Sequence, residues 1–133
     1  MTDEKILYFL AVLFILLTIL DLIIYKTCIF ERPLEVLPII LSHRLVWIFG
    51  NFGWVFNNKK ILIAFLIFQI TLMFHWRVNG GCIMTQVQNE ICGYPKDTNY
   101  DYIYVMLGKK KAGIVKSLYF IIIYIFIGYK LSN

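Results

Sequence analysis

Apolar residues along this chain fall into four long blocks separated by short polar connectors, and they do not follow the dispersed pattern of a soluble domain. The first block covers residues 6–25. Twenty residues of α-helix span about 30 Å, which is the thickness of a bilayer's hydrocarbon core. Asp3 and Glu4 precede the block, and no small-residue cleavage site follows it. We therefore expect a retained membrane span rather than a removed signal peptide.

The second block, residues 34–56, is less uniform. His43 and Arg44 interrupt it, and Gly50 and Gly53 lie three residues apart. Small residues at this spacing let a neighbouring helix approach closely. The alternative is an amphipathic helix that lies in the membrane interface. The basic residues do not repeat along one helical face, so the pattern favours a true span.

The remaining blocks cover residues 61–77 and 112–129, and the polar turn 57–60 joins the second block to the third. So short a turn predicts an antiparallel helical hairpin. Between the third and fourth blocks lies the polar segment 78–111, in which glycines and a proline predict turns and one helical turn around 85–91. The predicted fold is all-α: a single domain forming a four-helix membrane bundle with one polar loop.

Composition supports the membrane interpretation. Hydrophobic residues make up 60% of the 133 residues, and the mean hydropathy is +0.73. So apolar a chain has too few polar residues to cover a surface in water, and lipid is the simplest apolar surrounding. The net charge is +5, but the charged residues sit mostly in connectors. That placement suits lipid headgroups better than nucleic acid, so we expect no nucleic-acid partner.

Basic residues also suggest an orientation. Four spans would place both termini and the 57–60 turn on one side, and the first connector and the long loop on the other. The positive-inside rule then predicts a cytoplasmic, capsid-facing loop. The loop side carries more basic residues: Lys26, Arg32, Arg77, Lys96, Lys109, Lys110 and Lys111, against Lys5, Lys59, Lys60 and Lys130.

The three cysteines, Cys28, Cys82 and Cys92, all fall on the loop side of this topology. We expect a Cys82–Cys92 disulfide, because a loop bounded by glycines has few other ways to hold its shape. A cytoplasmic loop would normally keep its thiols reduced, so this expectation opposes the predicted orientation.

Two ionisable residues inside the predicted spans are candidates for a specific role, since charge is costly in lipid. Asp21 lies about one turn from the end of the first span, and Arg44 lies about two turns into the second from the same side. We predict that they form an ion pair within the bundle. A pair that fixes helix register is favoured over a proton or ion pathway.

The sequence offers little support for enzymatic chemistry. His75, Cys28, Cys82 and Cys92 are the residue types of a Cys3His zinc site, but no C-x2-C pair is present, so we expect no metal. Thiol redox enzymes usually carry C-x-x-C, which is also lacking. We therefore expect neither catalytic residues nor a cofactor.

Residues 75–88, HWRVNGGCIMTQVQ, resemble a motif of the form HWxxNxGxCxLTxLE. It belongs to a family of small four-helix membrane proteins found in bacteria and, in looser versions, in large DNA viruses. Gln88 and Met84 stand where the family has Glu and Leu. The resemblance implies a fold and a topology, and no particular activity. The matching loop residues are His75, Trp76, Asn79, Gly81 (or Gly80), Cys82 and Thr85, with His43 and Gly53-Trp54 upstream.

The predicted function is that of a structural membrane component of a large assembly. The bias towards Ile, Phe, Tyr, Lys and Asn is typical of AT-rich genomes, and with the motif it favours a giant-virus inner-membrane protein beneath the capsid. Its partners would be lipid and neighbouring proteins, with no small-molecule substrate. An accessory subunit of a protist mitochondrial complex is one alternative. Others are an oligomeric channel or transporter using Asp21, His43, Arg44 and Gln69, and a thiol oxidoreductase using Cys82 and Cys92.

Overall fold

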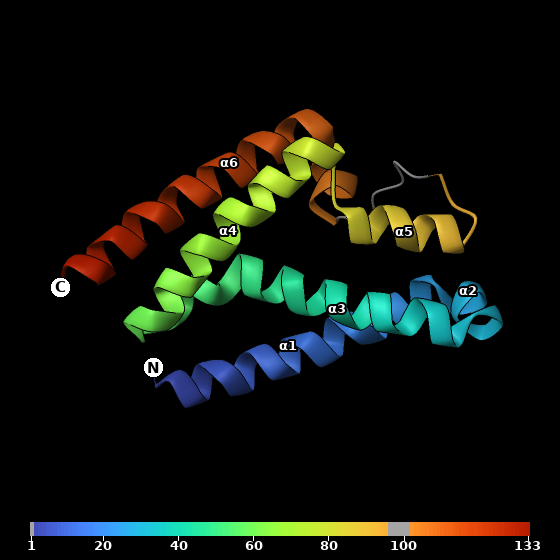
Figure 1. Ribbon diagram of the computed structural model, residues 1–133, viewed down its shortest axis with the longest axis horizontal. Helices are drawn as coiled ribbons and strands as arrows, with labels where there is room; N and C mark the ends of the chain where they lie inside the picture. Colours follow the sequence, from blue (N-terminus) through green and yellow to red (C-terminus); the bar gives the residue numbers. More distant parts are fainter. Residues whose placement is uncertain (1, 96–101) are drawn as a thin grey trace. The chain divides into compact units, whose positions relative to one another are not determined.

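The computed structural model describes residues 2–95 and 102–133, without the side chains of 102–106, 109 and 110. All regular structure within these ranges is helical (Figure 1). The elements are α1 (Asp3–Ile24), α2 (Lys26–Glu31), α3 (Pro33–Phe52), the short 3-10 helix η1 (Gly53–Val55), α4 (Lys59–Asn79), α5 (Ile83–Ile91) and α6 (Tyr102–Ser132).

Four helical segments are long and apolar enough to cross a membrane, as the block pattern predicts. Each is close to one of the predicted spans, and most extend a few residues further at one end. The first begins at Asp3 instead of residue 6, because Asp3 and Glu4 are favourable beside the partial positive charge of a helix N-terminus. The four segments are Asp3–Ile24, Pro33–Val55, Lys59–Asn79 and Lys111–Ser132.

The predicted polar loop 78–111 is in large part helical, which corrects that expectation. It contains the nine-residue helix α5 and the first part of α6. Gly80, at φ 68°, ends α4 in the left-handed conformation that glycine adopts at no steric cost. Gly108 interrupts α6 with φ 74° and ψ 157°, so the segment before it is set off from the membrane-length part.

The chain divides into two compact units, residues 1–97 and 98–133. In the first unit α1 and α3 run antiparallel and lie side by side (Figure 1). Apolar side chains bury the contact at both ends. Ile6 and Leu10 of α1 pack with Ile48 near the end of α3. At the opposite end Tyr25 packs beside Val36.

Helices α3 and α4 form the predicted hairpin. The side chain of Asn58 caps α4 by accepting a hydrogen bond from the backbone N–H of Lys60 at 2.9 Å. A Cβ atom at Gly53 would overlap the ring of Phe65, so this close approach requires glycine. Further along α4, the amide of Gln69 donates a hydrogen bond to the backbone carbonyl of Gly50. The two glycines therefore do admit the neighbouring helix.

The unit 98–133 consists mainly of α6. Its membrane-length part, Lys111–Ser132, exposes large apolar side chains along the helix, among them Ile122 and Ile125. Lys130 lies in the last turn, where a cation is favourable beside the partial negative charge of a helix C-terminus, and its Nζ lies 5.0 Å from the centre of the Phe126 ring.

Candidate functional site

Asp21 and Arg44 form the ion pair that their depths in the sequence predict. Nε and Nη2 of Arg44 each donate a hydrogen bond to one carboxylate oxygen of Asp21, which makes the contact bidentate. The Asp21 side chain is buried, with 7% of its area exposed, and the Arg44 side chain is largely buried, with 13% exposed. The pair joins α1 to α3 between their two apolar contacts.

The guanidinium group of Arg44 also lies against an aromatic ring. Its Cζ atom is 5.9 Å from the centre of the Trp47 ring, one turn further along α3. A cation over an indole face is attracted by the ring's quadrupole, and the attraction grows when water is excluded. Arg44 is thus stabilised by a carboxylate from α1 and by a ring from its own helix, an arrangement that compensates a charge removed from water.

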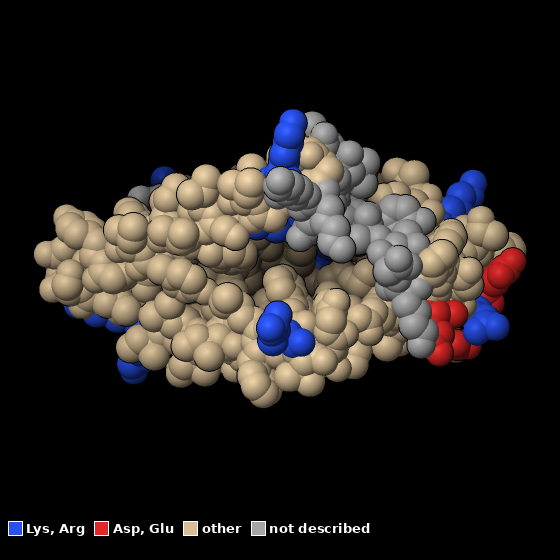
Figure 2. Space-filling model, turned by 90° about the horizontal axis from the view of Figure 1, so that it is seen from above, with Lys and Arg blue, Asp and Glu red and all other residues tan. Residues whose placement is uncertain are grey.

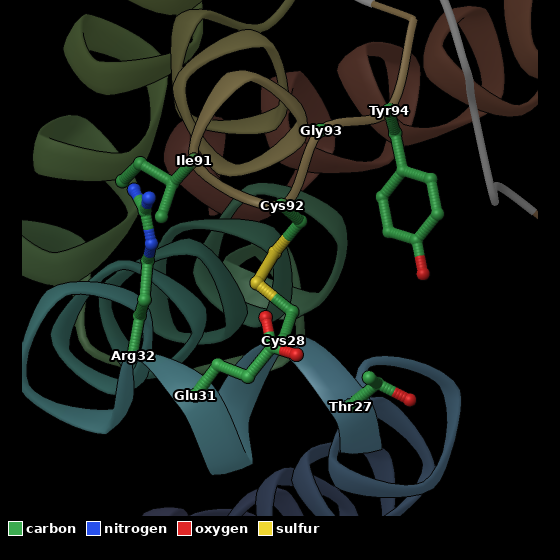
Figure 3. A pocket seen from close by; sticks show the side chains of 8 residues that line it. All are labelled: Thr27, Cys28, Glu31, Arg32, Ile91, Cys92, Gly93 and Tyr94. Atoms are coloured by element: carbon green, nitrogen blue, oxygen red, sulfur yellow. A yellow bond between two sulfur atoms is a disulfide. The ribbon is translucent and has the colours of Figure 1, made fainter.

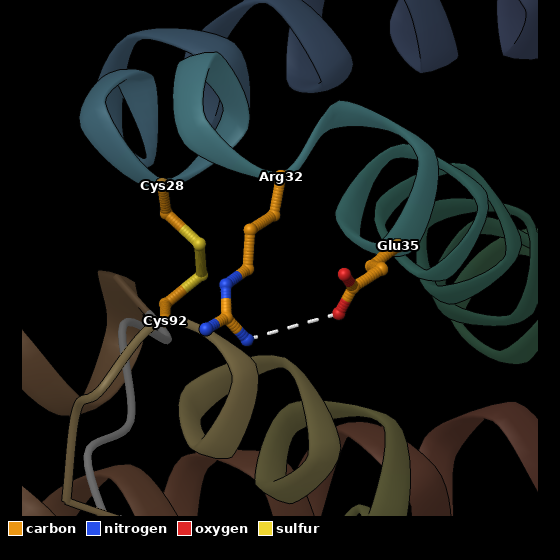
Figure 4. The surroundings of a disulfide bond; sticks show 4 residues. All are labelled: Cys28, Arg32, Glu35 and Cys92. Carbon is orange, nitrogen blue, oxygen red and sulfur yellow. Dashed lines mark ion pairs between the residues drawn. A yellow bond between two sulfur atoms is a disulfide. The ribbon is translucent and has the colours of Figure 1, made fainter.

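The disulfide in the structure joins Cys28 to Cys92, so the predicted Cys82–Cys92 pairing is wrong (Figure 4). The two Cα atoms are 5.3 Å apart, within the usual range for a disulfide. Cys82 is a free thiol. The bond attaches the C-terminal end of α5 to α2. Beside it Arg32 and Glu35 form an exposed ion pair at 3.8 Å.

The helical structure of α5 explains why Cys82 and Cys92 do not pair. Cys82 is the N-cap of this helix and Cys92 its C-cap. Ten residues at about 1.5 Å each separate them by about 15 Å, more than twice the Cα–Cα distance that a disulfide tolerates. Cys28, on the short helix α2, lies where Cys92 can reach it.

A small pocket opens beside the disulfide, with a volume of about 270 Å³. Figure 3 shows Arg32 and Tyr94 flanking the bond on two sides. The Tyr94 ring also packs edge-on against that of Tyr25 at the end of α1, with centres 6.0 Å apart. Gly93, at φ 70°, permits the turn that ends α5, in which Tyr94 N–H donates to the Asn89 carbonyl at 2.8 Å. These contacts fix the end of α5 on α2 and α1.

The other end of α5 carries the second contact of chemical interest. Sγ of Cys82 lies 3.6 Å from Nε2 of His43, on α3. His43 and Arg44 are adjacent in sequence, and successive helical residues differ by about 100° in direction. His43 therefore reaches α5, and Arg44 reaches α1. Both side chains of the Cys82–His43 pair are partly exposed.

The thiol of Cys82 is unusually acidic for a cysteine. Burial by itself would raise the pKa of this thiol. The hydrogen bond and positive charge of His43, followed by the backbone N–H and the hydroxyl of Thr85, outweigh that effect and lower the pKa of Cys82 to about 6. Such a thiol is mostly thiolate at neutral pH. We refer below to His43, Cys82 and Thr85 as the thiol site.

The motif residues 75–88 form the junction between α4 and α5. His75, Trp76 and Asn79 occupy the last turns of α4, and the Asn79 side chain donates to the His75 carbonyl at 2.9 Å. Gly81 follows with extended backbone. Cys82 is the N-cap of α5, and Thr85 is the third residue of that helix.

No family model, curated protein or solved structure matches this chain.

The structure brings together residues that the sequence analysis left apart. The sequence analysis predicts no contact between His43 and Cys82, which the structure places side by side. His75, which shares the residue types of a zinc site with the three cysteines but was not expected to bind metal with them, lies beside Asn79. The groups that could carry chemistry or hold the fold are the Asp21–Arg44 ion pair, the Cys28–Cys92 disulfide and the acidic Cys82 thiol beside the His43 imidazole.

Proposed function

We propose that this chain is an integral membrane protein that crosses the bilayer with its four apolar helical segments. The support lies in their exposed faces. Leu7 of α1 and Ile67 of α4 are each 62% exposed, and Ile122 of α6 is 66% exposed. Contiguous apolar surface of this extent is unfavourable in water and favourable in lipid. On the face shown in Figure 2 charged side chains are sparse.

Within that membrane, we infer a structural role for the protein. The observation that carries this inference is the set of directional links that converge on α3. Asp21 of α1 bonds to Arg44, Gln69 of α4 bonds to the Gly50 carbonyl, and Cys82 of α5 contacts His43. A transporter needs at least one packed element that shifts between two positions. Because α1 and α4 are both hydrogen-bonded to α3, these helices are held in one arrangement, which favours a rigid component over a transporter.

The role extends to a larger assembly in which lipid and neighbouring proteins are the partners. The AT-rich composition and the motif at residues 75–88 favour the inner membrane of a giant virus, where the protein would lie beneath the capsid. Of these two features, the motif is the one that favours this placement over a mitochondrial one, because an AT-rich bias is shared by large DNA viruses and organelles. A channel is less favoured, because Asp21 and Arg44, which would line its path, bind each other.

The disulfide bears on the orientation of the protein. Cys28 follows α1 and Cys92 follows α4, so two intervening spans would return the chain to the same side, as the bond requires. Disulfides persist in oxidising compartments. We propose that α2 and α5 face such a compartment, which is opposite to the orientation that the basic residues favour. The disulfide is given more weight than the charges, because the difference of seven basic residues against four is small.

The structural role is tested by cross-linking in the native membrane. Lysine-reactive cross-linking, mild-detergent extraction and mass spectrometry are expected to recover this 15.7 kDa chain in a larger complex, joined to different neighbouring proteins in constant proportion. Cross-links between copies of this chain alone would favour the oligomeric channel. Recovery as an isolated monomer would contradict the proposal.

A further inference from the structure

We propose that α5 is embedded in one leaflet of the bilayer, and that its exposed apolar face, formed by Ile83 and Val87, contacts lipid acyl chains. The inference rests on the proposed function, because it requires α3 to cross the membrane. The N-terminal end of α5 lies towards the bilayer centre. Its C-terminal end, which carries the Cys28–Cys92 disulfide, lies at the surface that faces the oxidising compartment.

The depth of α5 follows from its contacts with α3. At the thiol site Cys82, the N-cap of α5, lies beside His43, the eleventh residue of α3. His43 is about 15 Å from the start of α3, or half the thickness of the hydrocarbon core. At the other end of α5, Ile91 packs against the apolar cluster that contains Val36. Nine helical residues cover about 14 Å, so α5 lies beside the first half of α3 (Figure 1).

The course of α4 agrees with this depth. Its Gln69 bonds to Gly50 of α3, and thirteen residues later Cys82 lies beside His43, which is only seven residues from Gly50. The chain therefore advances along α3 by about half of what two parallel helices of equal rise would cover. It is still within the bilayer where Gly80 ends α4. Helices α4 and α5 together complete the third crossing.

Polar and apolar side chains on α5 are arranged in the reverse of the order expected in water. Gln88 and Asn89 are 4% and 0% exposed, whereas Ile83 and Val87 are 42% and 40% exposed. The two apolar residues are four positions apart, so they lie on one face of the helix. A helix that packs on a soluble core buries its aliphatic side chains and exposes its amides. Surrounding lipid makes the opposite arrangement favourable.

Polar side chains of α5 form hydrogen bonds within the protein, as lipid surroundings require. The amide of Gln86 donates to the backbone carbonyl of Asn79 at 3.1 Å, and the amide of Asn89 donates to the carbonyl of Pro95 at 3.2 Å. Hydrocarbon offers such groups no partner, so internal bonds of this kind favour the embedded position. At the deeper end the ionisable pair of the thiol site is likewise held between two helices.

The charged residues around α5 are compatible with this position. No charged residue occurs between Arg77 and Glu90. Arg77 is exposed in the last turn of α4, and its long side chain can extend towards the headgroups. Glu90 lies in the last turn of α5, at the membrane surface. At the same level Phe30 and Leu34 are 89% and 90% exposed, which suits the membrane interface better than water.

The accessibility of spin labels in proteoliposomes tests the inference. The full-length chain carries Cys82→Ser, which leaves the Cys28–Cys92 bond intact, together with either Ile83→Cys or Val87→Cys as the position for a nitroxide label. Molecular oxygen is apolar and concentrates in the bilayer, whereas a nickel chelate stays in water. We expect oxygen to collide with the label more often than the nickel chelate does at both positions.

Two positions on α4 are the matched references in the same background. Ile67→Cys is the reference for lipid, because Ile67 is 62% exposed in a membrane-length helix, and Lys59→Cys, at the polar turn, is the reference for water. A nickel excess at Ile83 and Val87 with an oxygen excess at Ile67 would overturn the inference and leave membrane insertion intact. Labels on α5 that neither reagent reaches would also overturn it, because a protein would then cover the face. A nickel excess at Ile67 as well would contradict the proposed function itself.

Discussion

Asp21→Ala is expected to lower the free energy of unfolding of the detergent-solubilised protein by about 3–5 kcal/mol, because it leaves the buried guanidinium of Arg44 without its carboxylate. Arg44→Ala should have a similar effect for the converse reason. Thermal unfolding in one detergent, followed by the loss of soluble monomer, would show both variants well below the wild type.

A double-mutant cycle with leucine at both positions, including the single variants Asp21→Leu and Arg44→Leu, separates the value of the pair from the cost of breaking it. Asp21→Leu with Arg44→Leu removes both charges at once and is expected to be close to the wild type in stability, because replacing both members of a buried pair by apolar residues is often neutral. Arg32→Ala is a matched control on an exposed pair and should cost less than about 1 kcal/mol. Single variants as stable as the double variant would show that Asp21 and Arg44 do not interact.

Cys28→Ser is expected to cost about 2–4 kcal/mol of stability, because the disulfide closes a segment with a sequence separation of 64 residues. Cys92→Ser should cost the same amount, and the two changes together should cost no more than either alone. The midpoint of thermal unfolding, measured with and without reductant, reports the loss directly.

Cys82→Ser is the control for the disulfide. It leaves the Cys28–Cys92 bond intact, so its unfolding midpoint should stay near the wild-type value and should still fall on reduction. Non-reducing peptide mapping of the wild-type protein should recover a linked peptide that contains Cys28 and Cys92. A linked peptide containing Cys82 would contradict this pairing.

The ion pair was predictable because both residues lie towards the same end of two neighbouring helices. Asp21 lies about one turn from the end of α1, and Arg44 lies about three turns into α3, with the short helix α2 between them. A short connector makes neighbouring helices antiparallel, so two charged residues near the connected ends can meet. The hairpin of α3 and α4 was predictable for the same reason, since three unstructured residues, 56–58, leave the chain little choice of direction.

The disulfide was not predictable in this way, because pairing between cysteines on one side of the membrane depends on the structure of the loop. The glycines at 80, 81 and 93 suggested turns, whereas the residues between them repeat apolar positions at Ile83, Val87 and Ile91, a spacing of four that is typical of a helix. That spacing indicates a helix that separates Cys82 from Cys92 and leaves Cys28 as the partner of Cys92.

The contact between His43 and Cys82 had only a faint signal in the sequence. Both belong to the same motif, but they are 39 residues apart, and no periodicity relates a residue in a span to one in a connecting segment. Their proximity follows from tertiary packing, in which the disulfide at one end of α5 and the turn after α4 at the other lay that helix along α3.

We infer that α3, the least uniform of the four apolar segments, crosses the bilayer, so that the residues before and after it lie on opposite sides. Single cysteines placed at Glu31 and Lys59 in a cysteine-free chain, labelled with a membrane-impermeant maleimide in sealed vesicles, test it directly. We predict that one position is labelled in intact vesicles and the other only after permeabilisation. Labelling of both from the same side would place α3 along the membrane surface and contradict the account.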